Sequence, residues 1–178
     1  LQVYYVDKSL LCEDSVNRKQ LQHLLLQNSS WPEMETKIDQ NPQEPQMLMI
    51  RVFQHNLPVA MVYVRNSGTE DKLGLYLRGS KKLTEELDSL AKKVYSYLMI
   101  SFKNKKSLMA RAEKSILHSL IHNTGENIEL VEPEFEKVPL DRLLNEMSSR
   151  QKLIEKIKGI WRITDLGMTL INHSVNSE

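Results

Sequence analysis

Hydrophobic and polar positions along the chain form two kinds of repeating pattern. Apolar, β-branched or alternating residues occur in three short stretches, which predict strands: Met47–Phe53, Pro58–Val64 and Leu73–Leu77. From Leu83 to Ser101 the apolar residues recur at helical spacing, and Ser80 is suited to cap such a helix. We therefore expect an α+β fold in which a small, mostly antiparallel sheet carries this helix on one face.

The residues before these strands give weaker signals. Val3–Val6 reads as a short strand, and apolar residues at helical spacing after Asp14 predict a helix. Residues Trp31–Pro45 hold three of the six prolines and many polar side chains, which predicts an extended loop.

The last third of the chain has a mostly helical pattern. The predicted helices are Leu108–His122, Pro139–Met147 and Gln151–Lys158, the last ended by Gly159. Other predicted segments are Glu126–Glu136 as strand or loop, Ile160–Thr164 as a strand and Asp165–Asn172 as a turn or helix.

Charge changes sign along the chain and suggests a domain boundary. Residues 1–106 hold 15 Lys or Arg and 12 Asp or Glu, a net charge of +3, whereas residues 107–178 hold 9 and 11, a net charge of −2. We place a boundary near Ser107, so that a domain of residues 1–106 precedes a tail of residues 107–178. The whole chain has 178 residues and a net charge of +1, a value that favours binding to neither nucleic acid nor a membrane surface.

Three further features concern membrane association, cellular compartment and the length of the parent protein. No apolar run approaches the roughly 20 residues that span a bilayer, so we expect no membrane partner. Cys12 is the single cysteine, which excludes an internal disulfide and fits a cytoplasmic protein. The chain starts at Leu1 without a Met, and we expect it to be a fragment of a longer protein.

The polar segment between the second and third predicted strands has the parts of an anion site. Arg65 offers a planar fork that matches two phosphate oxygens, and Ser67 and Thr69 offer hydroxyl donors. Gly68 allows close approach of the backbone, and a left-handed residue there would turn consecutive N–H groups into an anion nest. The alternative is an ordinary polar hairpin loop, because the same residue types are common in turns.

The sequence Arg65-Asn66-Ser67-Gly68-Thr69-Glu70 resembles the phosphate-binding loop of the α-D-phosphohexomutases, which include phosphoglucomutases and phosphomannomutases. In that family the loop lies between two strands of the last domain and a helix follows, as predicted here. Lys72 also matches, and the resemblance covers about Gln46–Phe102. Asp71 departs from it, since the family usually has proline there, and Arg78 stands where the family often has glutamate.

This resemblance implies a function for the loop. It implies that Arg65, Asn66, Ser67, Gly68 and Thr69 bind the phosphate of a sugar phosphate, while Glu70 and Lys72 orient the loop. The family's phosphoserine, magnesium and sugar-reading motifs are absent from the sequence, so no residue of this chain is expected to be catalytic. The catalytic serine and the magnesium loop are expected in upstream domains of the full enzyme. The alternative is a non-catalytic phosphate-binding or regulatory module.

The tail resembles another kind of domain. Its short helices, followed by Trp-Arg-Ile-Thr-Asp-Leu-Gly-Met-Thr-Leu, resemble the end of many winged-helix domains. A DNA-binding domain needs a basic recognition helix, and the candidate, Gln151–Lys158, lies in an acidic tail. We therefore expect the tail to be a packing or protein-contact module and nucleic acid to be an unlikely partner. His118 and His122 have the spacing of a metal pair, but no third ligand is evident, so no metal site is expected.

Overall fold

The chain folds into two compact units, Leu1–Phe102 and Lys103–Glu178. The structure is a computed structural model that describes residues 1–28, 31, 33–123 and 125–175, with side chains up to 172. The structure divides the chain between Phe102 and Lys103, a few residues before Ser107, which is the boundary expected from the change in charge. Each unit is described below by itself.

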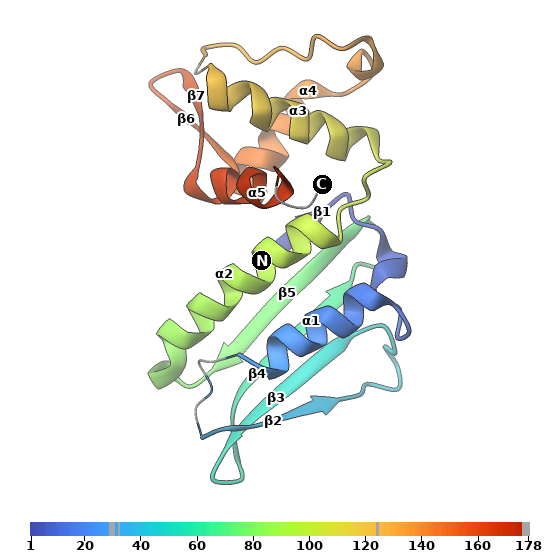
Figure 1. The fold of residues 1–178 in the computed structure, drawn as a ribbon, viewed down its shortest axis with the longest axis vertical. Coiled ribbons are helices and arrows are strands. Elements are labelled where there is room, and N and C mark those ends of the chain that lie inside the picture. Colours follow the sequence, from blue (N-terminus) through green and yellow to red (C-terminus); the bar gives the residue numbers. More distant parts are fainter. Residues whose placement is uncertain (29–30, 32, 124, 176–178) are drawn as a thin grey trace. The chain divides into compact units, whose positions relative to one another are not determined.

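A five-stranded sheet forms the first unit over its described residues. Every neighbouring pair of strands is antiparallel, in the order β1-β5-β4-β3-β2 (Figure 1). The strands are β1 (Gln2–Tyr4), β2 (Glu35–Asp39), β3 (Leu48–Gln54), β4 (Leu57–Asn66) and β5 (Lys72–Gly79). This arrangement confirms the predicted α+β class and antiparallel sheet. Strands β4 and β5 contain two of the predicted strands, and β3 contains the third except for Met47.

Two helices, α1 (Val16–Leu26) and α2 (Thr84–Ser101), lie on the same face of this sheet (Figure 1). Short 3₁₀ helices, η1 (Lys8–Leu11) and η2 (Lys81–Leu83), precede them. The Oγ of Ser80 accepts the N–H of Lys82 at 3.3 Å, so Ser80 caps the helical segment as predicted. The core between helices and sheet is apolar and includes Leu21, Leu25, Ile50, Val52, Val62, Leu75, Leu90 and Leu98.

Strand β4 shows how the sheet separates its two faces. Ala60, Val62 and Val64 are buried beneath the helices, and the side chains between them point to the other face because successive residues of a strand alternate. On that face Tyr63 stacks on Tyr76 of β5, with ring centroids 4.7 Å apart and planes 8° from parallel. The alternation also places Arg65 on the face without helices.

The prediction of a loop throughout Trp31–Pro45 is wrong, because β2 lies within it. Strand β2 pairs with β3 only, from Glu35 opposite Phe53 to Asp39 opposite Met49. Its five residues are exposed or half-buried and include no apolar run, so the sequence pattern does not reveal a strand. An edge strand of this kind is held by backbone pairing and shows little hydrophobic pattern.

The second unit combines helices with a two-stranded hairpin. In chain order its elements are α3 (Leu108–His122), the 3₁₀ helix η3 (Pro133–Phe135), α4 (Leu140–Asn145), the π-helix η4 (Glu146–Arg150), β6 (Ile154–Ile157), β7 (Ile160–Ile163) and α5 (Asp165–Val175). Gly125 forms an isolated antiparallel bridge with Trp161 of β7. The segment predicted as the helix Pro139–Met147 is thus helical, and the π-helix η4 extends it to Arg150.

The prediction of a helix over Gln151–Lys158 is wrong. Strand β6 occupies most of this segment and pairs with β7, from Ile154 opposite Ile163 to Ile157 opposite Ile160. Lys158 and Gly159 have φ of 50° and 85°, which makes the two-residue turn that a tight hairpin requires. Lysine and glutamate favour a helix locally, but the cross-strand pairs decide the conformation.

Buried polar groups join the start of the second unit to its helices. Lys103 Nζ lies 2.7 Å from Glu113 Oε1 on α3 and donates to Gln151 Oε1 at 3.0 Å. Gln151 Nε2 in turn donates to Glu113 Oε2 at 2.8 Å. Burial lowers the pKa of Lys103, and the charges of Glu113 and Glu146 oppose that shift.

Candidate functional site

The candidate phosphate loop is the hairpin connection between β4 and β5. Arg65 and Asn66 belong to the end of β4, opposite Gly74 and Leu73 of β5, and only Ser67–Asp71 lie outside the strands. The N–H of Ser67 donates to the carbonyl of Lys72 at 2.9 Å and closes the connection. The sheet register thus fixes the backbone of Arg65 and Asn66, whereas the other three predicted site residues lie on an exposed turn.

The hydroxyl of Ser67 organises this turn from within. Its Oγ accepts the N–H of Thr69 at 3.4 Å and the N–H of Glu70 at 3.3 Å. Gly68 does not have a φ in the left-handed region, so the expected nest around a left-handed Gly68 is wrong for this structure. The physical reason is that two of the amides that would form the nest point to the serine oxygen instead.

Arg65 presents a half-exposed guanidinium beside the loop. Its side chain is 45% exposed, and its Nε lies 3.4 Å from Oε2 of Glu44, which is 41% exposed. Exposed pairs of this kind contribute only about 0–1 kcal/mol, so the contact is easily exchanged for another anion. Of the predicted site residues, Arg65 is the cation that could bind two oxygens of a phosphate.

Asn66 lies on the opposite side of β4 and contacts the same segment as Arg65 does. Its Nδ2 donates to Oε1 of Gln46 at 2.8 Å. Together with the Arg65–Glu44 pair, this bond fastens the segment 41–47 to the end of β4. Neither Glu44 nor Gln46 was predicted as a site residue.

Buried Arg18 holds this neighbouring segment in place. The guanidinium of Arg18, on α1, donates to the carbonyls of Leu11, Pro45 and Met47 at 2.9, 3.2 and 3.4 Å. Its side chain belongs to the buried core, with 7% exposed. No local pattern predicted this role, because Arg18 looks like an ordinary polar residue within a helical pattern.

Two more ion pairs neutralise the cations around the loop. Lys72 Nζ pairs with Glu70 and lies 5.8 Å from the centroid of the Tyr4 ring. Lys8 Nζ lies 3.7 Å from Oδ1 of Asp71. Glu70 and Lys72 therefore brace the hairpin.

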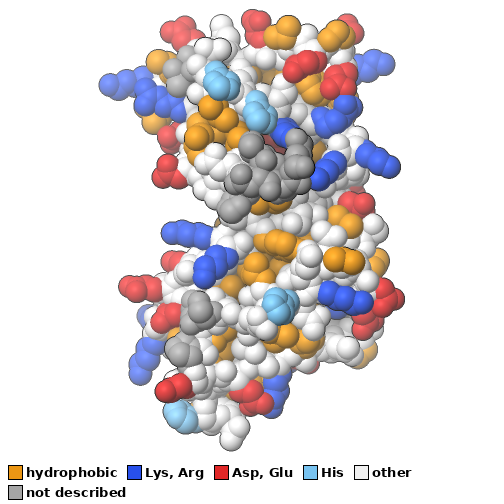
Figure 2. Space-filling model, viewed as in Figure 1, with side chains coloured by type: hydrophobic (Ala, Val, Ile, Leu, Met, Phe, Trp, Pro, Cys, Tyr) orange, Lys and Arg blue, Asp and Glu red, His pale blue; other side chains and the backbone are white. Residues whose placement is uncertain are grey.

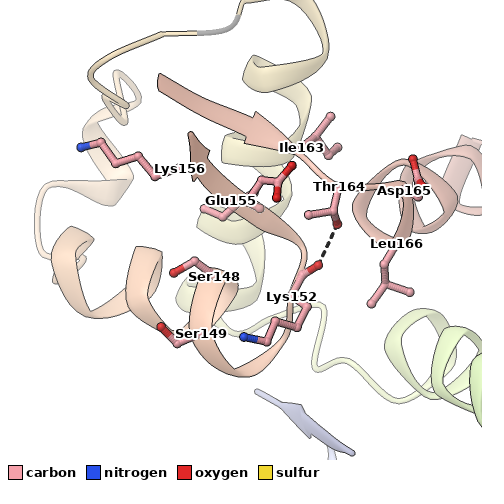
Figure 3. Close-up of a pocket in the computed structure, with 10 residues that line it drawn as sticks. Ser148, Ser149, Lys152, Glu155, Lys156, Ile163, Thr164, Asp165 and Leu166 are labelled. Carbon is pink, nitrogen blue, oxygen red and sulfur yellow. Dashed lines mark hydrogen bonds between the residues drawn. The ribbon is translucent and has the colours of Figure 1, made fainter. Parts of the chain in front are cut away.

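The second unit contains a separate hollow of about 690 Å³ between η4, β6 and the start of α5. Figure 3 shows the residues around it, among them Ser149, Lys152, Glu155 and Asp165. The hydroxyl of Thr164 donates to the carbonyl of Lys152 at 2.7 Å and accepts the N–H of Gly167 at 3.2 Å. The threonine thus fixes the start of α5, and the mixed charges around the hollow favour no particular ligand.

His118 is half-buried and His122 exposed on α3, and within the described ranges no three His, Cys, Asp or Glu residues cluster as metal ligands would. Among helices of the described part, none is long and apolar enough to cross a membrane. On the face shown in Figure 2, Lys and Arg side chains are interspersed with Asp and Glu.

Comparisons with known proteins add no relative. A scan against protein-family models and searches of curated proteins and solved structures return no match to this chain.

Proposed function

We propose that residues 1–102 are the substrate-phosphate-binding part of a cytoplasmic phosphosugar mutase of the phosphohexomutase type. One observation carries the proposal: the segment Arg65–Glu70 covers the end of one strand and most of its connection to the next, antiparallel strand. It presents a half-exposed arginine beside exposed loop residues, and a helix follows the second strand. This is the structural context in which the family's loop would lie.

In this function the chain's task is to position a substrate. Arg65 binds two oxygens of the sugar's phosphate, while the hydroxyl groups of Ser67 and Thr69 and nearby amides complete the contact. Binding requires the amides of Thr69 and Glu70 to turn from the serine oxygen toward the ligand. The reacting serine and the magnesium site of such an enzyme would lie in its other domains, and no chemical step is assigned to this chain.

A second candidate function is a non-catalytic phosphate-binding or regulatory module. The order of elements in the second unit favours it: a helix, a bridged segment, a shorter helical region and a hairpin follow one another as in a winged-helix domain. In this alternative the second unit contacts another protein. Phosphoserine and magnesium motifs encoded upstream of Leu1 would support the enzyme, and a start codon there would support the module.

The proposal is tested by adding inorganic phosphate to the ¹⁵N-labelled chain and following its amide resonances. We expect the amides of Ser67, Gly68 and Thr69 to shift with a Kd in the millimolar range, about −4 kcal/mol, because one arginine and a few donors hold the ion. Arg65→Ala should abolish these shifts. Arg78→Ala removes an exposed arginine elsewhere on β5 and should preserve them. Loop amides that stay unchanged while others move would disprove phosphate binding here.

A further inference from the structure

The face of the first unit's sheet that carries no helix gathers cations and aromatic rings. The three central strands, β3, β4 and β5, contain four Lys or Arg and no Asp or Glu. All four side chains belong to this face, because the buried apolar residues that alternate with them face the helices. The cations are Arg51, Arg65, Lys72 and Arg78, and the aromatic residues on the same face are Phe53, Tyr63 and Tyr76.

Some of these side chains form two rows across the sheet. In the first row Arg51 of β3 lies opposite Met61 of β4, which lies opposite Arg78 of β5. In the second row, two residues further along β4, Tyr63 lies opposite Tyr76, and the two rings are stacked. Because two residues of a strand span about 7 Å, the arginine row and the tyrosine row run side by side at about that distance.

The arginine row is accessible to an anion. A hollow of about 490 Å³ lies over it, lined by Arg51, Met61 and Arg78 together with Val59, Gly79 and Ser80. Arg51 Nη2 lies 2.6 Å from Oδ2 of Asp39 on the edge strand β2, but both side chains are partly exposed, at 49% and 32%. Such exposed pairs contribute little, so a phosphate can replace the carboxylate. Arg78 is exposed and has no ion-pair partner among the described residues.

Tyr76 offers an aromatic surface beside this row. The residue is 39% exposed, and a Cβ on Gly74 would lie 2.5 Å from its ring. The absence of a side chain at Gly74 therefore lets the ring lie along the strand, where Tyr63 covers one of its faces. An unpaired nucleic-acid base can stack on such a ring whatever its identity, because every base has a π-face.

Cations lie on both sides of the tyrosine pair. Arg65 of β4 lies opposite Gly74, which is four residues from Arg78 along β5, a distance of about 13 Å. Tyr76 lies between these two positions. A partner that contacts both arginines and the ring must therefore be longer than one nucleotide.

We propose that this face binds a single-stranded nucleic acid. Arg51 and Arg78 bind phosphate on one side of the tyrosine pair, Arg65 binds phosphate on the other, and an unpaired base stacks on Tyr76. Charge complementarity identifies the partner, since a single strand is anionic along its length and carries exposed flat rings. An acidic peptide lacks the regular rings, and a duplex keeps its bases stacked inside.

The net charge of the chain does not reveal this face. Residues 1–102 hold 12 Lys or Arg and 12 Asp or Glu, a net charge of 0. The acidic residues lie outside the three central strands, so the balance of charge hides a basic surface. The expectation that nucleic acid is an unlikely partner was drawn from the net charge and from the tail, and it did not consider this sheet.

The test is fluorescence anisotropy of a labelled oligo(dT) of about 12 nucleotides, on adding the full chain at about 50 mM salt. We expect a Kd of about 10⁻⁴–10⁻⁶ M that weakens as salt is added. Tyr76→Ala should weaken binding about five-fold or more, because one stacked base is lost, whereas Tyr76→Phe keeps the ring and should bind as the wild-type chain does. Arg78→Gln should weaken binding and reduce the salt slope by about 0.7, the value for one phosphate of a single strand.

Lys93→Gln is the matched control, because it removes an exposed charge from α2 on the helix side of the sheet, and it should leave binding unchanged. Equal losses in Lys93→Gln and Arg78→Gln, or in Tyr76→Phe and Tyr76→Ala, would overturn the inference. It would also be overturned if a duplex of the same length or thymidine monophosphate bound as tightly as the oligomer, or if the oligomer did not bind. Phosphate binding by the loop is measured on other residues, so the two sites can fail independently.

Discussion

The ammonium group of Lys103 lies 2.7 Å from a carboxylate oxygen of Glu113, and both side chains are at most one-tenth exposed. Gln151 binds both partners, so the first residue of the second unit is tied to α3 and to the end of η4. Removing one charge of a buried pair leaves the other without compensation, whereas removing both need not destabilise the fold.

This relationship predicts a non-additive effect on stability. Lys103→Met and Glu113→Gln should each lower the free energy of unfolding by about 3–5 kcal/mol. The double variant Lys103→Met with Glu113→Gln should lose clearly less than the sum of the two single changes. Urea unfolding of all the variants measures these differences, and additive losses would show that the two charges are not coupled.

The lowered pKa of Lys103 predicts how stability depends on pH. The unfolded chain, with an ordinary lysine pKa of 10.5, binds this proton more tightly than the folded chain does. The stability that this group contributes is therefore fully present above pH 10.5, the pKa in the unfolded chain. It is lost as the pH falls through the lowered pKa of Lys103 in the folded chain. Relative to Lys103→Met, the wild-type chain should gain stability as pH rises toward 10.5. Parallel stability curves for the two chains would contradict the shift.

Arg18 is predicted to be structurally important although it contacts no proposed ligand. Arg18→Met removes three hydrogen bonds to backbone carbonyls and should cost about 2–4 kcal/mol. The amide resonances of Glu44 and Gln46 should also move, because their segment loses its anchor. Lys19→Met, an exposed change on the same helix, should alter stability by less than about 0.5 kcal/mol. Equal effects of the two changes would argue against the anchoring role.

Two glycines are predicted to respond differently to alanine. A Cβ at Gly68 meets no atom within 4 Å, and its φ is outside the left-handed region, so Gly68→Ala should be neutral or stabilise by about 0.4–1 kcal/mol. A Cβ at Gly167 would contact the carbonyl oxygen of Leu153 and lie 2.7 Å from Cγ1 of Ile163. Gly167→Ala should therefore cost about 1–3 kcal/mol, as thermal unfolding would measure. A destabilising Gly68→Ala would indicate that the loop needs a conformation reserved for glycine.

The second unit is predicted not to bind duplex DNA specifically. Around its hollow, Lys152 and Lys156 are offset by Glu155 and Asp165, and the unit as a whole, residues 103–178, holds 12 Lys or Arg and 11 Asp or Glu, a net charge of only +1. Fluorescence anisotropy of a labelled duplex should stay unchanged on adding the full chain at physiological salt. Salt-sensitive binding that weakens in Lys156→Ala would contradict this prediction.

The sequence alone determined the elements with strong local patterns. The strands β3, β4 and β5 and the helix α2 follow from alternating or helical apolar positions, because burial of one face imposes those periods. A polar connection here was also predictable, because Ser67–Asp71 lie between two such strands; that Arg65 and Asn66 belong to the first strand was not. In these segments, local preference and tertiary packing agree.

Only the tertiary structure decided the remaining features, because they depend on contacts between distant parts of the chain. Strand β2 forms by pairing with β3, and β6 forms by pairing with β7, although neither segment has a distinctive strand pattern. Glu44 reaches Arg65 because Arg18 holds the backbone of a proline-containing segment against β4. Gly68 avoids the left-handed region because the Ser67 hydroxyl accepts the loop's amides, a choice among turn geometries that residue types alone leave open.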